Sequence, residues 1–263
     1  MAITLPIWLD DLIFKELKAQ YRPQYSDMTN IDDDKEKTLN YLGTYFPRSY
    51  AESYCIFSDY FKSNNSKYAN KEELSIFDFG SGTGGEIIGL LTVLDGLFPN
   101  LKKIRIVALD GNQHALLLYE EILSAFQKRT QIAIKSSPAH LHINFFKLEK
   151  LDSVMTEQFD IIVTFKAICE FVSKKQFEEI NAYEHVTKFL LPKLKDNGLL
   201  LLEDITSKDE DLDEWLPKMM DKGLLSVNCT IVARNESYNQ TYIINHSRKT
   251  CDKSKVAWRM ITN

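Results

Sequence analysis

Apolar residues follow a helical spacing in the first part of the chain and gather into short continuous runs after residue 74. Five apolar residues near the start fall on one face of a predicted helix: Trp8, Leu9, Leu12, Ile13 and Leu17. A second helix is expected to end before Pro47, which has no backbone N–H to donate, and Ser49 can cap a third helix that reaches about residue 61. Residues 1–70 are therefore predicted to form an N-terminal helical cap.

Residues 71–263 show a different rhythm, in which apolar runs alternate with helical patterns. One helix is predicted to open at Ser173, which forms a capping-box pattern with Gln176, and to run to Leu191. Continuous apolar strands separated by helices are typical of a parallel sheet covered on both faces, so the fold class is α/β. The acidic stretch 208–214 is predicted to be the first turn of a surface helix. Strands are predicted at 74–79, 104–110, 141–148, 159–165 and 199–204, followed by antiparallel strands at 225–233, 241–245 and 255–261.

Glycines crowd the loop after the first of these strands, in the stretch FDFGSGTGGEI. They permit backbone torsions and a close approach of a ligand that a Cβ atom would block. A phosphate-binding P-loop needs a lysine after its glycines, and this loop has none, so that loop type is excluded. Gly80, Gly82 and Gly85 match the GxGxxG spacing of dinucleotide-binding proteins, and Asp78, Gly80, Gly82 and Gly84 match the order DxGxGxG.

The glycines alone are compatible with a dinucleotide or with S-adenosylmethionine, and Asp78 discriminates between these two cofactors. A dinucleotide places its pyrophosphate on this loop and on the helix N-terminus, where a carboxylate would repel it. S-adenosylmethionine has no phosphate and carries an ammonium and a sulfonium, so an acid suits it. Asp110 ends the next strand and can accept hydrogen bonds from both ribose hydroxyls, although it would serve NAD as well. Leu109 and Gly111 beside it would wall the adenine.

The cap supplies two further candidates next to Pro47. A cap of this kind can close over the methionyl end of the cofactor and exclude water. We assign Arg48 to cofactor binding and Tyr50 to catalysis, with plain helix packing as the alternative. The expected cofactor is S-adenosylmethionine, and its predicted binding residues are Asp78, Gly80, Ser81, Gly82, Thr83, Gly84, Asp110, Gly111 and Arg48.

Composition limits the class of protein without naming it. The chain has 263 residues, of which 44% are hydrophobic and 26% charged, as in an ordinary soluble globular protein. Its 4 cysteines form no CxxC pair and no Cys/His cluster, so no metal site is expected. The same cysteine pattern fits a protein of the reducing cytoplasm. His140 and His142 alternate on a predicted strand, and for them a solvated edge is favoured over metal binding. No signal peptide or membrane span is predicted.

The charge is unevenly distributed. The net charge of −5 is not typical of a dedicated nucleic-acid binder. Residues 223–263 nevertheless contain six Lys/Arg against two acids, a net charge of +4. A solvated face is the simpler interpretation of this basic segment, and contact with RNA is the alternative.

Three segments add a family resemblance to the fold prediction: YLGTYFPRSYAESYCIF (41–57), FDIIVTFKAICEF (159–171) and GLLLLEDIT (198–206). The core resembles a class I S-adenosylmethionine-dependent methyltransferase, and these segments resemble the mitochondrial small-ribosomal-subunit methyltransferase-like family and its bacterial relatives. The resemblance implies a Rossmann-like, doubly wound, mostly parallel sheet of seven strands and an rRNA acceptor. The matching positions are Tyr41, Leu42, Pro47, Ser49, Tyr50, Ala51, Glu170, Glu203 and Thr206.

The chain departs from that family in two places. The family commonly carries a cysteine cluster suited to an iron–sulfur centre, and only Cys229 and Cys251 lie in the corresponding region. Ile205 replaces a glycine expected at the end of the fifth strand. The resemblance therefore supports the methyltransferase core better than it supports work on the ribosome.

Catalytic candidates follow the strand 159–165. Methyl transfer from a sulfonium depends mainly on alignment, and a base is needed only if the acceptor must lose a proton. The turn contains no proline, which disfavours the exocyclic-amine and C5-pyrimidine classes of nucleic-acid methyltransferase, and Cys169 reads as a buried small hydrophobe. Lys166 and Glu170 are the catalytic candidates. The alternative for Lys166 is an exposed surface lysine, and the alternative for Glu170 is an acid at the start of a helix.

Two functions stay open at this point. The first is an S-adenosylmethionine-dependent methyltransferase, whose acceptor is rRNA by resemblance and a small molecule or protein by charge. The second is an assembly or scaffold protein that binds the cofactor without turnover. A third hypothesis, an NAD-dependent oxidoreductase, is supported only by the GxGxxG spacing. The acceptor and the oligomeric state do not follow from the sequence.

Overall fold

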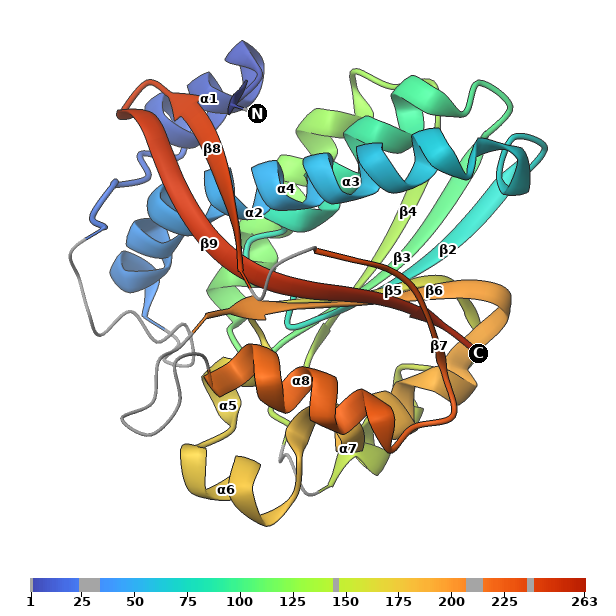
Figure 1. The fold of residues 1–263 in the computed structure, drawn as a ribbon. Helices are drawn as coiled ribbons and strands as arrows, with labels where there is room; N and C mark the ends of the chain where they lie inside the picture. Colours follow the sequence, from blue (N-terminus) through green and yellow to red (C-terminus); the bar gives the residue numbers. More distant parts are fainter. Residues whose placement is uncertain (1, 24–33, 144–146, 207–214, 236–238) are drawn as a thin grey trace.

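Figure 1 shows the computed structural model of the chain, which describes residues 2–23, 34–143, 147–206, 215–235 and 239–263. A sheet of nine strands lies at the centre of this described part, with helices on both faces. The strands are β1 Ala2–Thr4, β2 Glu73–Phe79, β3 Lys103–Asp110, β4 Ala133–His140, β5 Phe159–Phe165, β6 Leu194–Ile205, β7 Thr230–Arg234, β8 Gln240–His246 and β9 Lys249–Thr262.

Helices α2, α3 and α4 lie on one face of the sheet, and α5 to α8 lie on the other (Figure 1). Each face buries its own apolar cluster. The α-helices are α1 Ile7–Asp11, α2 Lys35–Ser63, α3 Gly85–Leu97, α4 Gln113–Gln127, α5 Ile168–Phe171, α6 Lys174–Glu179, α7 Ala182–Leu190 and α8 Trp215–Leu225; a π-helical turn, Leu12–Glu16, continues α1. Short 3₁₀ turns occur at Asn65–Lys67, Leu148–Ser153 and Leu191–Lys193.

The strand order, β1-β8-β9-β6-β5-β2-β3-β4 with β7 paired to β9, confirms the predicted α/β, doubly wound architecture. Strands β4, β3, β2, β5 and β6 are parallel, whereas β9 runs antiparallel to β6, β7 and β8. Two strands exceed the predicted seven-stranded sheet. The N-terminal β1 pairs with the edge of β8, so the first residues of the chain extend the sheet itself.

The direction of winding reverses at β2. The chain proceeds from β2 to β3 and β4 on one side and then returns to place β5 and β6 on the other. Ligands of open α/β sheets bind outside the carboxyl ends of the strands at such a reversal. The loops after β2, β3 and β5 therefore define where a site is expected.

The predicted strand at 141–148 is wrong in the residues that the structure describes, since residues 141–143 are irregular and residue 148 begins a 3₁₀ turn. The third parallel strand is instead β4, Ala133–His140, which includes Pro138. It lies at the sheet edge and alternates between exposed and half-buried residues, so it lacks the apolar run that marks a central strand. The apolar residues that follow it line a cavity instead.

The predicted break at Pro47 is also wrong, because α2 continues through this proline. Proline cannot donate to the carbonyl of Gly43, four residues earlier, and an interior proline costs a helix about 3 kcal/mol. Phe46 and Tyr50 on either side of it are buried in the core, and this burial holds both halves in one helix. Ser49, predicted as a cap, lies in the helix interior.

Helices α2 and α3 approach closely through two glycines of α3. A Cβ atom at Gly85 would lie 2.5 Å from the carbonyl oxygen of Phe46, and one at Gly89 would lie 2.6 Å from that of Tyr50. Neither backbone could give way without moving a helix. Gly85, which completed the GxGxxG pattern in sequence, therefore has a packing function here.

Three further boundaries differ from the prediction. The helix from Ser173 carries its capping box but ends at Glu179, and Asn181 caps a separate helix, α7. The stretch predicted as a strand at 225–233 includes the end of α8, and β7 begins only at Thr230. The predicted helical turn at 208–214 lies outside the described residues.

Candidate active site

The glycine loop after β2 folds over the end of β3. The backbone N–H groups of Gly80 and Ser81 both donate to the carbonyl of Leu109 at 2.9 Å. Gly80, Gly82 and Gly84 have φ values of 74°, 47° and 81°, a region that residues with a Cβ atom rarely adopt. A Cβ atom at Gly80 would lie 2.4 Å from the Cβ of Ala167, so the loop packs directly against the turn after β5.

Asp110 at the end of β3 organises this loop. One carboxylate oxygen accepts from the N–H of Gly82 at 2.7 Å and the other accepts from the N–H of Asn112 at 2.7 Å. A carboxylate has about four lone-pair positions, so capacity for two more donors remains. Burial raises the pKa of Asp110, while these N–H groups act in the opposite direction.

Two more acids are buried beside the loop. Asp78, in β2, is completely buried, and neither of its carboxylate oxygens has a hydrogen-bond partner. Glu86, in the first turn of α3, is 6% exposed, and burial raises its pKa to about 7. Burial, followed by the charge of Glu86, raises the pKa of Asp78 well above its usual value. Burial thus favours the neutral form of Asp78, and Glu86 is the acid of this pair that ionises near neutral pH.

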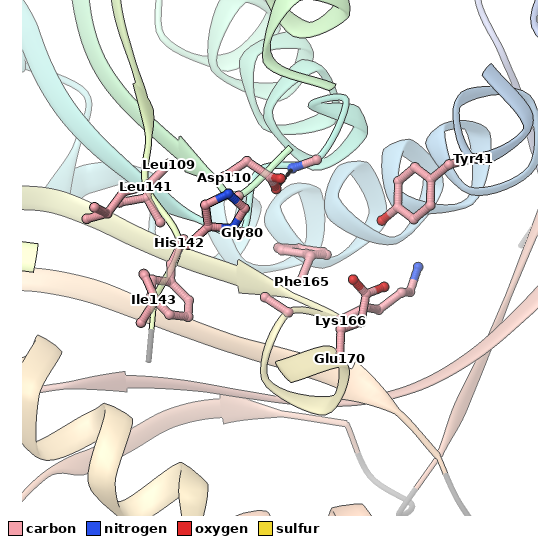
Figure 2. A pocket seen from close by; sticks show the side chains of 14 residues that line it. Tyr41, Gly80, Leu109, Asp110, Leu141, His142, Ile143, Phe165, Lys166 and Glu170 are labelled. Carbon is pink, nitrogen blue, oxygen red and sulfur yellow. Dashed lines mark hydrogen bonds between the residues drawn. The ribbon is translucent and has the colours of Figure 1, made fainter. Parts of the chain in front are cut away.

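A cavity opens over these carboxyl ends, and Figure 2 shows its wall. It encloses about 720 Å³ of empty space, including open solvent at its mouth. Its charged residues are Asp110, Lys166 and Glu170. The lining consists of Tyr41, Phe79, Gly80, Gly82, Leu109, Asp110, Gly111, Leu141, His142, Ile143, Phe165, Lys166, Ala167 and Glu170.

Lys166 is the only lysine or arginine among the lining residues, and its ammonium is already paired. It donates to Glu52 of α2 in a buried ion pair and to the hydroxyl of Ser49 at 3.3 Å. Burial lowers the pKa of Lys166, but Glu52 and Glu203 outweigh burial and the net shift is upward. Lys166 is therefore a charged group held by α2 and is not available as a base. Its backbone φ of 53° marks the tight turn that β5 makes here.

Glu170, in α5, faces the cavity without a protein hydrogen bond among the described residues (Figure 2). Burial raises its pKa to about 8, and the charges of Asp110 and Asp204 act in the same direction. Asp204 anchors the turn below it, because it accepts from the hydroxyl of Tyr183 at 2.9 Å and from the N–H of Cys169 at 3.1 Å. The carboxyl group of Glu170 is thus the one acid of this turn that is directed to the ligand space.

Tyr41 completes the wall from the side of α2, and the sequence analysis did not assign it to the site. Its hydroxyl points into the cavity toward Glu170 (Figure 2). Burial raises the pKa of Tyr41 well above its usual value, and the largest electrostatic contribution comes from Glu170. The tyrosine therefore stays neutral and presents an O–H group.

The structure brings six of the predicted site residues into one wall: Gly80, Gly82, Asp110, Gly111, Lys166 and Glu170. Four others, Asp78, Ser81, Thr83 and Gly84, lie in β2 or the glycine loop but not on the cavity surface.

Arg48 and Tyr50 lie elsewhere. Arg48 forms a two-bond ion pair with Asp252 of β9, at 2.9 and 2.8 Å. Tyr50 is 3% exposed and stacks with Tyr54, and burial raises its pKa to about 12. Neither side chain lines the cavity.

Seven lining residues were not assigned to the site from the sequence: Phe79, Phe165, Ala167, Tyr41, Leu141, His142 and Ile143. The last three follow strand β4 and lie at its carboxyl end. Because the sequence predicted a strand at 141–148, it placed them inside a strand. The available signal was the edge-strand alternation of 133–140. His142, read as a solvated edge residue, lies in the wall with its ring 5.2 Å from that of His140.

The basic segment 223–263 uses part of its charge inside the protein. Arg259 is 2% exposed and pairs with Asp221 at 2.6 Å. Arg248 lies over the ring of Phe14. Lys253 and Lys255 on β9 remain exposed.

Neither a metal cluster nor a membrane helix is found in the described ranges. No group of three or more His, Cys, Asp or Glu side chains there could hold a metal ion. None of the described helices combines the length and the apolar character needed to cross a bilayer.

Solved structures with a similar fold include methyltransferases. One is precorrin-6y C5,15-methyltransferase from Geobacter metallireducens, with 16% identity over 76% of this chain and 85% of that one and a TM-score of 0.42. Another is NSun6 from Pyrococcus horikoshii with SFG, an analogue of S-adenosylmethionine, with 16% identity over 72% of this chain and 47% of that one and a TM-score of 0.43. No family model and no curated protein sequence matches the chain. Similarities this distant show the fold and do not indicate the reaction.

Proposed function

We propose that this protein is an S-adenosylmethionine-dependent methyltransferase whose cofactor site is the cavity at the carboxyl ends of β2, β3 and β5. The observation that carries the proposal is the charge of this cavity. Its two acids, Asp110 and Glu170, have no ion-pair partner among the described residues, and its single lysine is neutralised by Glu52. A pyrophosphate would find no cation here, whereas a cationic, phosphate-free cofactor would find acids on two sides.

The residues present fit such a cofactor. Asp110 has free lone pairs for two ribose hydroxyls, and Leu109, Leu141 and Ile143 offer an apolar wall for adenine. Behind the glycine loop, Asp78 lies beside Glu86, whose pKa of about 7 lets it supply negative charge there near neutral pH. When bound, S-adenosylmethionine supplies a methyl group that is already activated by its positive sulfur.

The chain's own contribution is then mostly alignment and exclusion of water. Helix α2 forms one side of the cavity through Tyr41, and the ion pair of Lys166 with Glu52 ties this helix to the end of β5. This arrangement keeps the wall in place, as an enclosing element should. Lys166 thereby acts as a positioning residue.

Calorimetric titration with S-adenosylmethionine, S-adenosylhomocysteine and NAD tests the proposal. We expect both adenosyl ligands to bind and NAD to give no heat. Asp110→Ala should weaken adenosyl binding by 100-fold or more, since it removes both the ribose acceptor and the anchor of the loop. Asp95→Ala, which removes an exposed acid of α3, is the matched control and should bind normally. Binding of NAD alone would overturn the assignment.

Cofactor binding without turnover is the competing function and needs a separate measurement. Transfer of a labelled methyl group to any acceptor establishes an enzyme. Adenosyl binding with no transfer to RNA, protein or small-molecule fractions would instead support an assembly or scaffold role. For an RNA acceptor, affinity should fall with salt and in the Lys253→Ala/Lys255→Ala variant, because phosphate contacts release counterions.

A further inference from the structure

The cavity has two chemically different ends. The glycine loop and Asp110 lie at one end, with Leu109 of β3 and with Leu141 and Ile143 after β4. Tyr41 and Glu170 lie at the other, on α2 and α5, and Figure 2 shows the hydroxyl and the carboxyl group directed toward each other across the opening. The first end is accounted for by the cofactor, so the second is where a methyl acceptor must enter.

The groups at this second end recognise one kind of acceptor. Neither Tyr41 nor Glu170 has a hydrogen bond to another described residue, so both remain free to contact a ligand. The ammonium of Lys166 already donates to Glu52 and Ser49 on α2, so its charge is balanced by the carboxylate of Glu52. Phe165 supplies an apolar surface beside them. An acceptor therefore meets the carboxyl group of Glu170, which ionises near pH 8, together with a neutral hydroxyl and an aromatic ring.

We propose that the acceptor is a primary or secondary aliphatic amine and that Glu170 receives its proton while Tyr41 positions its nitrogen. This inference rests on the proposed methyltransferase function. In its ionised form, Glu170 would repel a phosphate-bearing acceptor at this end, and Asp110 nearby would add to the repulsion. An amine, positively charged in solution, is attracted there and becomes nucleophilic once its proton is removed.

The step balances within this set of groups. The ammonium form of the acceptor first gives one proton to Glu170, which exposes the nitrogen lone pair. The lone pair forms the new N–C bond to the methyl carbon as the bond from that carbon to the positive sulfur breaks and sulfur keeps its electron pair. The product is a methylated ammonium, and the proton leaves Glu170 for solvent. The raised pKa of Glu170, about 8, brings it closer to that of an amine, as a base for this task requires.

The amine can be a free small molecule or a lysine side chain, and both carry the same chemistry. A transfer assay with methyl-labelled S-adenosylmethionine distinguishes them. The small-molecule arm uses n-butylamine and putrescine, and the protein arm uses a lysine-containing peptide. Catechol and total RNA serve as hydroxyl and nucleic-acid comparators. Label in either amine arm supports the proposal, whereas label in catechol or RNA alone, or in no acceptor, would overturn it.

Variants separate the role of Glu170 from a structural one. Glu170→Gln should lower kcat for the amine by about 100-fold or more while S-adenosylhomocysteine affinity changes by less than about threefold. Tyr41→Phe should raise KM for the amine by about two- to tenfold with a smaller effect on kcat, because one hydrogen bond is lost. Glu121→Gln, at an exposed position on α4, is the matched control and should match the unmodified protein.

Calorimetry with n-butylamine gives a readout that does not depend on turnover. The complex with S-adenosylhomocysteine should bind this amine, and Glu170→Gln should lose that binding by tenfold or more. Equal amine binding by both proteins would overturn the assignment of Glu170. Failure of S-adenosylhomocysteine itself to bind would contradict the methyltransferase function, so the two failures are distinguishable.

Discussion

Lys166, at the end of β5, and Glu52, in the middle of α2, form a buried ion pair between residues that are 114 positions apart in the chain. The side chain of Glu52 is completely buried and that of Lys166 is 7% exposed. This pair links the helix that walls the cavity to the strand end where the chemistry is proposed. Its strength therefore bears on both stability and function.

Removing one member of this pair should destabilise the fold. Lys166→Met leaves a buried carboxylate without a counter-charge, and we expect the free energy of unfolding to fall by roughly 3–5 kcal/mol. The double variant Lys166→Met/Glu52→Leu should recover most of the loss, because neither charge is then left alone. Lys188→Met breaks the exposed pair with Glu184 and should cost about 0.5 kcal/mol or less. Urea denaturation measures all three, and equal losses for the exposed and buried pairs would contradict this account.

The contact between α2 and α3 predicts opposite outcomes for two glycines of the same helix. Gly89→Ala places a methyl group 2.6 Å from the carbonyl oxygen of Tyr50 and should destabilise the protein by about 1–3 kcal/mol. Gly96→Ala meets no atom within 4 Å and should be neutral or stabilising by up to about 1 kcal/mol, because alanine favours helix. Thermal unfolding of both variants gives the comparison. A stable Gly89→Ala protein would mean that the helices are farther apart.

The glycine loop predicts a loss of cofactor affinity from a single methyl group. Gly80→Ala requires an alanine at a φ of 74° and drives its Cβ against Ala167 at 2.4 Å. We expect S-adenosylhomocysteine affinity to fall tenfold or more, since both the loop and the turn after β5 must move. In Gly111→Ala the nearest atom to the new Cβ is a ring atom of His142 at 3.2 Å, a milder contact, so this variant should lose less affinity. Calorimetry ranks the two, and the reverse order would contradict the geometry.

Stability should decrease as pH rises through neutrality. Burial raises the pKa of Asp204 to about 6 and that of Glu170 to about 8, above the values of about 4 expected in the unfolded chain. The stability associated with their neutral forms is therefore fully present below pH 4 and is lost as pH rises through 6 and 8. Asp110, Asp204 and Lys166 are the charged groups that influence Glu170.

Glu170→Gln isolates one of these contributions. At pH 8.5 this variant should be more stable than the unmodified protein by roughly 1–4 kcal/mol, because glutamine never ionises. At pH 4 the two proteins should unfold alike. Urea denaturation across this pH range makes the measurement, with Glu121→Gln as the exposed control. Identical pH profiles for all three proteins would show that Glu170 ionises normally.

Sequence alone determined the features that depend on local pattern. The buried strands β2, β5 and β6 form continuous apolar runs, and a run of this kind has few other solutions than a covered parallel sheet. The glycine loop could be recognised because positive φ values select glycine. Asp110 could be placed because the end of a strand is a local property. These features sufficed for the fold class and one end of the cavity.

Tertiary structure alone decided the partners of the remaining side chains. The sequence leaves Lys166 as either an exposed lysine or a catalytic candidate, but in the structure it is buried and paired with Glu52. Arg48, assigned to cofactor binding from the sequence, pairs with Asp252. Pro47 predicts the end of a helix, but burial on both sides of it outweighs the lost hydrogen bond. Contacts between distant segments depend on packing free energies that no short stretch of sequence contains. The acceptor end of the cavity, where Tyr41 of α2 meets Glu170 of α5, is such a contact.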